Sequence, residues 1–261
     1  MKHDDYNQPL FDMLSEGKKP GAPEGIPVIS ILNKLNGLYD AGEYEKAKAV
    51  IDYWINDSEV IGDDRGQYTV LAEGLWLCYQ TNDCESALKY ADIAINLTQS
   101  TSAIGEVDLA LLIVAAANAI CVFGEAGKAL ELYDRALLFL EGNLKNGDSR
   151  LIACYNNRAM AHAKNGSLAK ATNDFYKALE LSKNACCYDL ALTYLNMSTV
   201  YFNRNDLQVA REYAKNCFDV LMRNANPSDE YYSYICKRFY SLLFELGELF
   251  LLAKLKKVNE Q

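Results

Sequence analysis

The sequence has few of the residues from which metal sites and basic nucleic-acid surfaces are built. Two of its 261 residues are histidine, and none of its eight cysteines stands in a CxxC pair. A tetrahedral zinc site therefore has no local ligand spacing from which to start. Basic residues are outnumbered 26 to 35, and a net charge of −9 does not suit a surface that must neutralise phosphates. We expect no metal, no cofactor and no nucleic-acid partner.

Long uncharged apolar runs and recognisable targeting signals are also lacking. The segment 1–27 carries Asp4, Asp5, Asp12 and Glu16, so it has neither the basic end nor the apolar run of a signal peptide. We find no stretch of 18 uncharged apolar residues that would span a bilayer. The sequence predicts a soluble, cytoplasmic protein with no membrane partner.

Catalytic motifs are missing as well. There is no glycine-rich phosphate loop and no HExxH. Cys154 and His162 are eight residues apart, about 12 Å along a helix, which is too far for a nucleophile and its base. Glu131 and Asp134 have the spacing of a solvated helix face. We therefore predict that the protein is not an enzyme.

The cysteines lie mostly among apolar residues of helical pattern, where a free thiol behaves as a small hydrophobic group. Buried, reduced cysteine is the expectation for most of them. The adjacent Cys186 and Cys187, close to an expected helix start, are the one candidate redox-sensitive pair.

A repeated pattern is what the sequence does have. Six segments share a helical apolar pattern, then Gly or Asn followed by an acid or Ser, then a second helical pattern. Gly and Asn tolerate the left-handed backbone that ends a helix, and the next side chain favours the amides that begin another. The six turns recur at intervals of 40, 42, 42, 39 and 42 residues, at Gly42-Glu43, Asn82-Asp83, Gly124-Glu125, Gly166-Ser167, Asn205-Asp206 and Gly247-Glu248.

Small residues recur at fixed distances after these turns. Five residues after each of the first five turns stands an alanine, and seven residues later a second small residue, with only Trp54 departing from this rule. Small side chains on one face let paired helices approach closely. The positions are Ala47, Ala87, Ala129, Ala171 and Ala210, then Ala94, Ala136, Ala178 and Cys217.

With this spacing of small and aromatic residues, segments 154–181 and 193–217 resemble the tetratricopeptide repeat (TPR) family. The resemblance covers roughly 28–259. Its period exceeds the usual 34 residues and is similar to the long-helix variety in kinesin light chains and bacterial peptide-sensing regulators. It implies an all-α fold, a right-handed superhelical array (α-solenoid) of about six helix-turn-helix repeats. HEAT-type repeats, with a similar period, are the alternative fold.

We predict a single solenoid over 28–261, preceded by an N-terminal extension, 1–27, that is loosely ordered or docked. The end repeats fit the pattern least well, as capping units do. The expected repeats lie near 28–57, 66–98, 105–142, 148–183, 187–224 and 228–259.

The resemblance also implies a function, a non-catalytic adaptor that binds an unidentified protein or peptide in a groove lined by the first helix of each repeat. A side-chain amide can pair with both groups of a peptide backbone, although each such bond contributes only about 0.5–1.5 kcal/mol, so apolar anchors are needed too. The alternative is that the asparagines are solvated, or bond to a neighbouring helix and hold the repeats in register. The candidate groove residues are Asn33, Asn36, Tyr39, Trp76, Asn118, Asn156, Asn157, Met160, Lys164, Asn196, Phe202, Lys237 and Arg238.

Val114 and Leu192 stand where a TPR clamp for a C-terminal carboxylate would need cations, which argues against that mode. Lys164, Lys237 and Arg238 remain candidates for contact with an acidic group.

The last helix does not have the polar outer face of a good cap. If Leu249, Leu252 and Ala253 face inward, a stripe of Leu251, Leu255 and Val258 points outward. This stripe could dock segment 9–14 (PLFDML), form a homodimer, or be wrapped by its own repeat. Two alternative functions follow, a self-associating scaffold and a small-peptide-responsive regulator, although 27 residues ahead of the repeats are too few for a regulator's effector domain.

Overall fold

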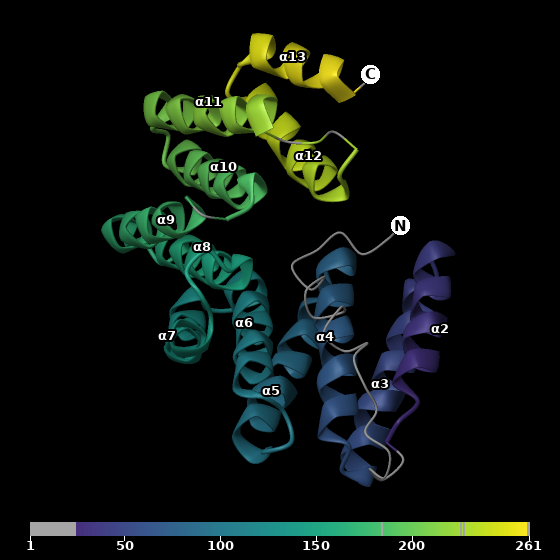
Figure 1. The fold of residues 1–261 in the computed structure, drawn as a ribbon. Helices are drawn as coiled ribbons and strands as arrows, with labels where there is room; N and C mark the ends of the chain where they lie inside the picture. Colours follow the sequence, from purple (N-terminus) through teal and green to yellow (C-terminus); the bar gives the residue numbers. More distant parts are fainter. Residues whose placement is uncertain (1–24, 184, 225, 227, 260–261) are drawn as a thin grey trace. The chain divides into compact units, whose positions relative to one another are not determined.

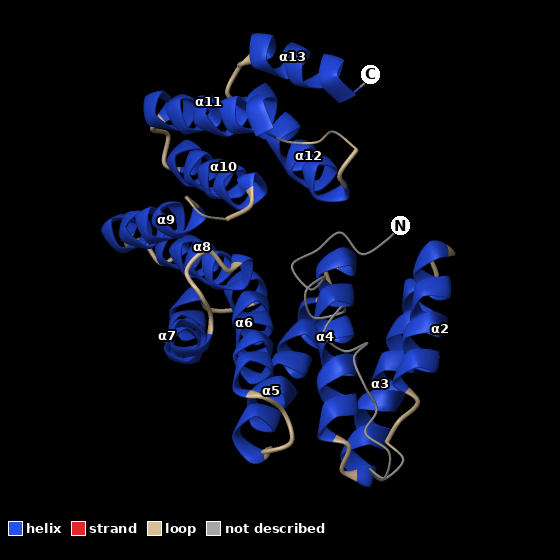
Figure 2. Cartoon of the chain, in the orientation of Figure 1, coloured by secondary structure: helices blue, strands red, loops and turns tan. Residues whose placement is uncertain are grey.

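The computed structural model describes residues 25–183, 185–224, 226 and 228–259, and the regular structure in these ranges is helical (Figures 1 and 2). The predicted all-α fold is confirmed. The helices are α2 (Val28–Asp40), α3 (Tyr44–Ile61), α4 (Asp64–Thr81), α5 (Cys84–Ser100), α6 (Glu106–Phe123), α7 (Ala126–Asn143), α8 (Ser149–Lys164), α9 (Leu168–Ser182), α10 (Cys187–Asn203), α11 (Leu207–Asn224), α12 (Glu230–Glu245) and α13 (Leu249–Asn259).

The chain divides into two compact units, which we call unit 1, ending at Leu140, and unit 2, beginning at Glu141. In both, helices that follow one another along the chain pack together, as expected of a repeat array. Unit 1 contains α2–α6 and most of α7, and unit 2 contains α8–α13. That the repeats form one right-handed superhelix stays a prediction.

Left-handed residues join the helices of a pair at five of the six predicted turns. The backbone angle φ is positive at Gly42, Asn82, Gly166, Asn205 and Gly247, between 55° and 79°. Gly124 is the exception, with φ at −127°. A Cβ atom there would lie 3.1 Å from the Ile120 carbonyl oxygen and 3.3 Å from the Leu88 side chain. The lack of room for a Cβ atom, and not a left-handed backbone, therefore favours glycine at this turn.

The residue after the turn caps the next helix where it is aspartate. Asp83 accepts a hydrogen bond from the Ser86 backbone N–H, and Asp206 accepts one from Val209. Glu43 and Ser167 make no such side-chain bond. The capping prediction is thus confirmed for these two aspartates, whereas the Glu43 carboxylate accepts a hydrogen bond from the Lys46 side chain of the same helix at 2.8 Å.

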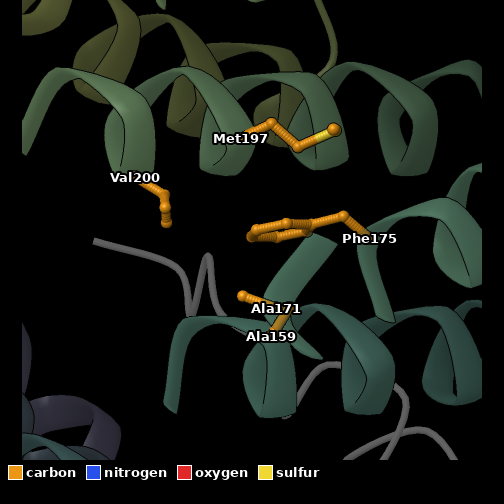
Figure 3. Close-up of a cluster of buried hydrophobic side chains, with 5 residues drawn as sticks. All are labelled: Ala159, Ala171, Phe175, Met197 and Val200. Carbon is orange, nitrogen blue, oxygen red and sulfur yellow. The ribbon is translucent and has the colours of Figure 1, made fainter. Parts of the chain in front are cut away.

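The small-residue prediction is confirmed. All five alanines that follow the turns are fully buried, as are Ala94, Ala136, Ala178 and Cys217. Figure 3 shows the consequence in unit 2, where Ala159 and Ala171 leave room for the ring of Phe175 beneath Met197 and Val200 of α10. Burying a ring of this size stabilises the fold by roughly 2–3 kcal/mol. One cluster thereby joins three successive helices, α8, α9 and α10.

Helix α6 is the most apolar element. Among the described residues it is the one helix long and apolar enough to cross a membrane, with a mean hydropathy of 2.0 over 18 residues. It packs against α4 and α5, and the run 110–117 is buried. The core helix of a repeat array has this same composition.

Candidate partner-binding surface

In unit 1 the first helices of successive repeats meet through aromatic side chains. The rings of Tyr39 in α2 and Trp76 in α4 lie 4.8 Å apart, and the Tyr39 hydroxyl donates to Glu73 at 3.4 Å. Burial, with the Glu73 charge next, raises the pKa of Tyr39 above its usual value. Tyr79 in α4 stacks on Phe123 in α6 at 5.7 Å. Both Tyr39 and Trp76 are buried, and their contact with a ligand stays a prediction.

The three candidate asparagines of unit 1 have different surroundings. Asn33 is exposed on α2, and Asn36 is half-buried. Asn118 accepts a hydrogen bond of 2.6 Å from the Tyr133 hydroxyl, so it ties α6 to α7 within one repeat. Asn33 is therefore the one exposed asparagine among these three candidates.

In unit 2 asparagines join the first helices. Asn156 in α8 donates to the Thr193 hydroxyl in α10 at 2.9 Å, and Asn196 in α10 accepts from Arg238 in α12 at 2.9 Å. The two asparagine residues are 1 % and 3 % exposed. This placement fits the alternative interpretation, in which asparagines hold repeats in register. Ligand contact by these two residues stays a prediction.

Asn157 is placed differently from its neighbour. It lies on α8, half-buried, and its side-chain nitrogen is buried without a hydrogen-bond partner among the described residues. A buried donor of this kind costs about 1–3 kcal/mol until an acceptor reaches it. Met160, one turn further along α8, packs on the Phe175 cluster and stays partly exposed, and Lys164 at the helix end is exposed. Phe202 on α10 is half-buried.

Arg238 anchors a patch of tyrosines and cations on α12. Besides its bond to Asn196, it donates to the Tyr234 hydroxyl at 3.4 Å, with its guanidinium carbon 5.8 Å from the centre of that ring. Tyr234 stacks on Tyr231 at 5.9 Å, and Lys237 beside Arg238 is exposed. The two tyrosines were not among the residues we expected from the sequence. The sequence signal that could have identified Tyr234 is its spacing, because it stands four residues before Arg238 and so shares a helix face with it.

The last helix has the opposite orientation to the one predicted. Leu255, expected outside, is fully buried, and Leu251 is half-buried. Leu249, expected inside, is 61 % exposed, and Ala253 is exposed too. The side chain of Val258 lies outside the described residues. The reason is Leu252, which stands where the first five repeats have alanine and is too large to let α13 approach α12 in the same way.

Five of the eight cysteines are buried, as expected, and Cys84 and Cys186 are exposed. Burial, and then the neighbouring Cys186, raises the pKa of the Cys187 thiol. A raised thiol pKa lowers the thiolate fraction and with it the reactivity.

His162 lies 3.8 Å from Asp174, whose carboxylate accepts two hydrogen bonds from Arg158. In the ranges the structure describes, no three His, Cys, Asp or Glu side chains are grouped to hold a metal ion.

The fold and these repeat-to-repeat contacts define the chain as an α-helical repeat protein. Within it, residues 151–186 match the tetratricopeptide repeat family model, and the chain is a TPR-like repeat protein. A search of curated protein sequences finds no match.

Several solved structures share the fold, including the following three. BtubC (BKLC) from P. vanneervenii has 16% identity and a TM-score of 0.51, over 84% of this chain and 87% of that one. A putative kinesin light chain with nearly identical TPR-like repeats from Podosopora anserina has 12% identity and a TM-score of 0.51, over 72% and 90%. A Rap protein complexed with Competence and Sporulation Factor has 14% identity and a TM-score of 0.54, over 89% and 75%. Similarity at these identities concerns the fold.

Proposed function

We propose that the protein is a non-catalytic adaptor that binds a segment of another protein or a peptide on the first-helix surface of unit 2. We define this surface by Asn157, Met160 and Lys164 on α8 and by Tyr234, Lys237 and Arg238 on α12, with Asn196 of α10 between them. TPR-like arrays serve in general as protein-interaction scaffolds, and the Rap protein with a similar fold is complexed with a factor.

The observation that carries the proposal is the buried Asn157 side-chain nitrogen, which lacks an acceptor among the described residues. Rotation of this half-buried side chain would bring the nitrogen within reach of a backbone carbonyl of an extended segment, which would supply that acceptor. Asn157, Asn196 and Arg238 stand nine residues before the turn in three successive repeats. A ligand that follows the first helices would therefore pass Asn157 and Arg238 in turn.

The charge of the surface indicates an acidic partner segment. Lys164 and Lys237 are exposed. The Arg238 guanidinium is fixed by hydrogen bonds to Asn196 and to the Tyr234 hydroxyl. Arginine fixed in this way loses little side-chain entropy when it pairs with a carboxylate. Met160 and Tyr234 are the apolar contacts beside these cations, and such contacts supply most of the binding free energy at interfaces.

A pull-down from native cytosol tests the proposal, with bound proteins identified by mass spectrometry. The variant Asn157→Ala, Lys237→Glu should lose a partner that the wild type retains. The matched control is Asn173→Ala, Lys170→Glu, two exposed residues on α9, which should keep the partner. Circular dichroism establishes that both variants fold. A folded site variant that retains every partner would reject this surface as the binding site.

The small-peptide-responsive regulator stays an alternative, favoured by the Rap protein structure with its bound factor. It predicts that a compact peptide co-purifies with the protein and is released on denaturation. The cytoplasmic location is likewise a proposal, and fractionation of the native cell would test it.

A further inference from the structure

The end of unit 2 carries an apolar surface that differs from the rest of the array. Phe244 at the end of α12 and Leu249 and Phe250 at the start of α13 are 69 %, 61 % and 68 % exposed. Beside them, an open hollow of about 450 Å³ lies between the two helices. It is lined by Tyr240, Ser241, Phe244, Glu245, Leu252 and Lys256. We call these residues, with Leu249 and Phe250, the end surface.

Comparison with the other repeats shows that Phe244 stands at an interface position. It lies three residues before its turn, as do Tyr39 and Tyr79 in the first two repeats. Those two rings pack on Trp76 and Phe123 of the repeat that follows. Among the described residues no other ring packs on Phe244, which therefore occupies the position of an inter-repeat contact and stays 69 % exposed.

Phe250 and the hollow are departures from the repeat pattern. At the position of Phe250 the first five repeats have Glu45, Glu85, Gly127, Ala169 and Gln208, all exposed. The Phe250 ring contacts the Lys254 side chain of its own helix, whose Nζ lies 4.4 Å from the ring centre, and stays 68 % exposed. At the position of Lys256 the first five repeats have a buried Ile, Ala, Tyr, Phe and Ala. Leu252 and Lys256 together keep α13 from closing onto α12, which leaves the hollow open.

The end surface also carries both signs of charge. Glu245 and Lys256 line the same hollow, and neither has an ion-pair partner in the described part of the chain. A two-fold interface brings one patch against a copy of itself, so a patch that holds both signs can pair with itself. In such a pair, Lys256 of each copy meets Glu245 of the other.

We propose that a second copy of this chain covers the end surface, in a two-fold dimer in which α12 and α13 of one copy pack on α12 and α13 of the other. The three exposed apolar side chains offer roughly 400 Å² per copy. A standard interface buries about 800 Å² on each partner. The apolar side chains thus provide about half of a standard interface, and we expect a weak, reversible dimer.

Sedimentation velocity of the full chain over about 1 to 500 µM measures this equilibrium. The wild type should pass from monomer to dimer. Phe250→Glu and Phe244→Glu should each weaken the dimer at least about 10-fold, because a charge replaces a central apolar contact. The matched control is Val60→Glu at an 85 % exposed position of α3, which should leave the equilibrium unchanged. A wild type that stays monomeric at every concentration overturns the proposal, as does a dimer insensitive to both phenylalanine variants.

A charge exchange tests the two-fold geometry. Glu245→Lys alone and Lys256→Glu alone should each weaken the dimer about 5-fold or more, because like charges then face each other. An equimolar mixture of these two variants should form a heterodimer of wild-type strength, since both cross-pairs are again opposite in sign. Native mass spectrometry distinguishes the heterodimer from either homodimer. A mixture that stays monomeric contradicts the proposed pairing.

Discussion

Units 1 and 2 join equivalent helices with different chemistry. In unit 1 the first helices of successive repeats meet through rings, Tyr39 on Trp76 and Tyr79 on Phe123. In unit 2 they meet through amides, Asn156 on Thr193 and Asn196 on Arg238. Aromatic contacts gain most of their energy from burial, whereas amide contacts are directional and worth less. The two units thus show that one repeat geometry accepts either kind of contact, and that the contact residues are buried or half-buried in both.

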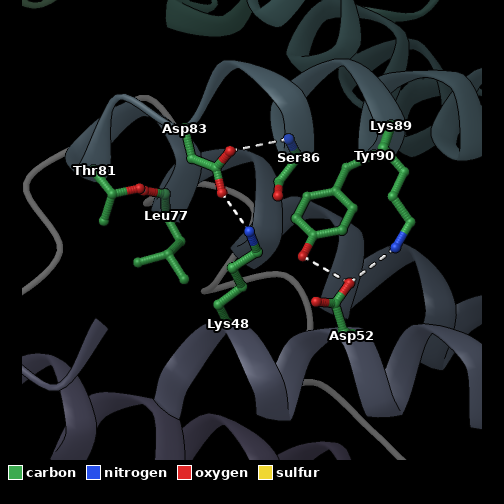
Figure 4. A network of polar contacts seen from close by, with 8 residues as sticks. All are labelled: Lys48, Asp52, Leu77, Thr81, Asp83, Ser86, Lys89 and Tyr90. Atoms are coloured by element: carbon green, nitrogen blue, oxygen red, sulfur yellow. Dashed lines mark hydrogen bonds and ion pairs between the residues drawn. The ribbon is translucent and has the colours of Figure 1, made fainter. Parts of the chain in front are cut away.

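The second helices, by contrast, are joined in the same way in both units. Lys48 in α3 pairs with Asp83 at 2.6 Å, and Arg211 in α11 pairs with Glu248 at 3.2 Å. In each case the cation lies six residues after one turn and the acid lies one residue after the next turn. Figure 4 shows the Lys48–Asp83 ion pair of unit 1. Beside it, the Tyr90 hydroxyl and the Lys89 ammonium group both donate hydrogen bonds to Asp52.

Removal of a ring in unit 1 should have the largest effect on stability. Trp76→Ala deletes a buried side chain that contacts the preceding repeat, and we expect it to lower the free energy of unfolding by about 3–5 kcal/mol. Because repeats contact only their neighbours, hydrogen exchange should rise in α2 and α4 and stay unchanged in α10 and α12. Equal loss of protection in both units would show that they are one cooperative structure, and the contrast between them would then be energetically irrelevant.

Removal of an asparagine amide in unit 2 should lower the free energy of unfolding by less. Asn196→Leu keeps the approximate volume but takes the acceptor away from Arg238, so we expect a loss of about 2 kcal/mol. Urea unfolding measures it. Asn33→Leu, on the exposed face of α2, is the matched control and should change stability by less than about 0.5 kcal/mol. If the two variants behave alike, Asn196 does not hold the repeats in register.

The smallest effect should come from the ion pair at Asp83, and it should depend on pH. The hydrogen bond from Lys48 lowers the pKa of Asp83 from 3.8 to about 2. A carboxyl whose pKa is lowered by folding stabilises the fold above its unfolded pKa, and this stabilisation is lost as the pH falls from about 4 through 2. We expect about 1 kcal/mol, because both side chains are partly in water.

Asp83→Asn isolates this ion pair, since asparagine keeps an oxygen to cap α5. The difference in unfolding free energy between wild type and variant should be present at pH 6, fall as the pH drops below about 4, and vanish only below about pH 2. A difference that is constant with pH would mean that the cap, and not the charge of Asp83, sets its contribution.

Much of the fold could be predicted from the sequence because the turn signal is local. Each helix pair needs a turn residue with positive φ and an alanine five residues later. Both therefore recur in the sequence once per repeat. Gly124 shows the limit, since a Cβ atom there would crowd both the Ile120 carbonyl oxygen of the same helix and the Leu88 side chain of another helix, and no local pattern reveals the second contact.

The candidate site could be predicted less well, because the exposure of a first-helix residue depends on the neighbouring repeat. Asn156 and Asn157 are adjacent in sequence, yet Asn156 is bonded to α10 and the Asn157 nitrogen has no partner in the described ranges. The predicted orientation of α13 was wrong because it, too, depends on packing against neighbouring helices. We took Leu249, Leu252 and Ala253 as its inner face, whereas the size of Leu252 turns Leu255 inward instead.

The recurring contact from one second helix to the next turn also bears on how such a chain can change length. Two of the first five repeats carry the cation, Lys48 in the first and Arg211 in the fifth, and each pairs with the acid after the next turn, Asp83 or Glu248. The other three have Leu88, Leu130 and Thr172 at this position. A duplication or deletion of one whole period in the gene would therefore keep this ion pair only where Lys48 or Arg211 comes to precede an acidic turn residue. In α13, Leu252 and Lys256 replace the small and apolar residues that stand at these positions in the first five repeats, so a repeat copied from it would not pack as closely on its neighbour.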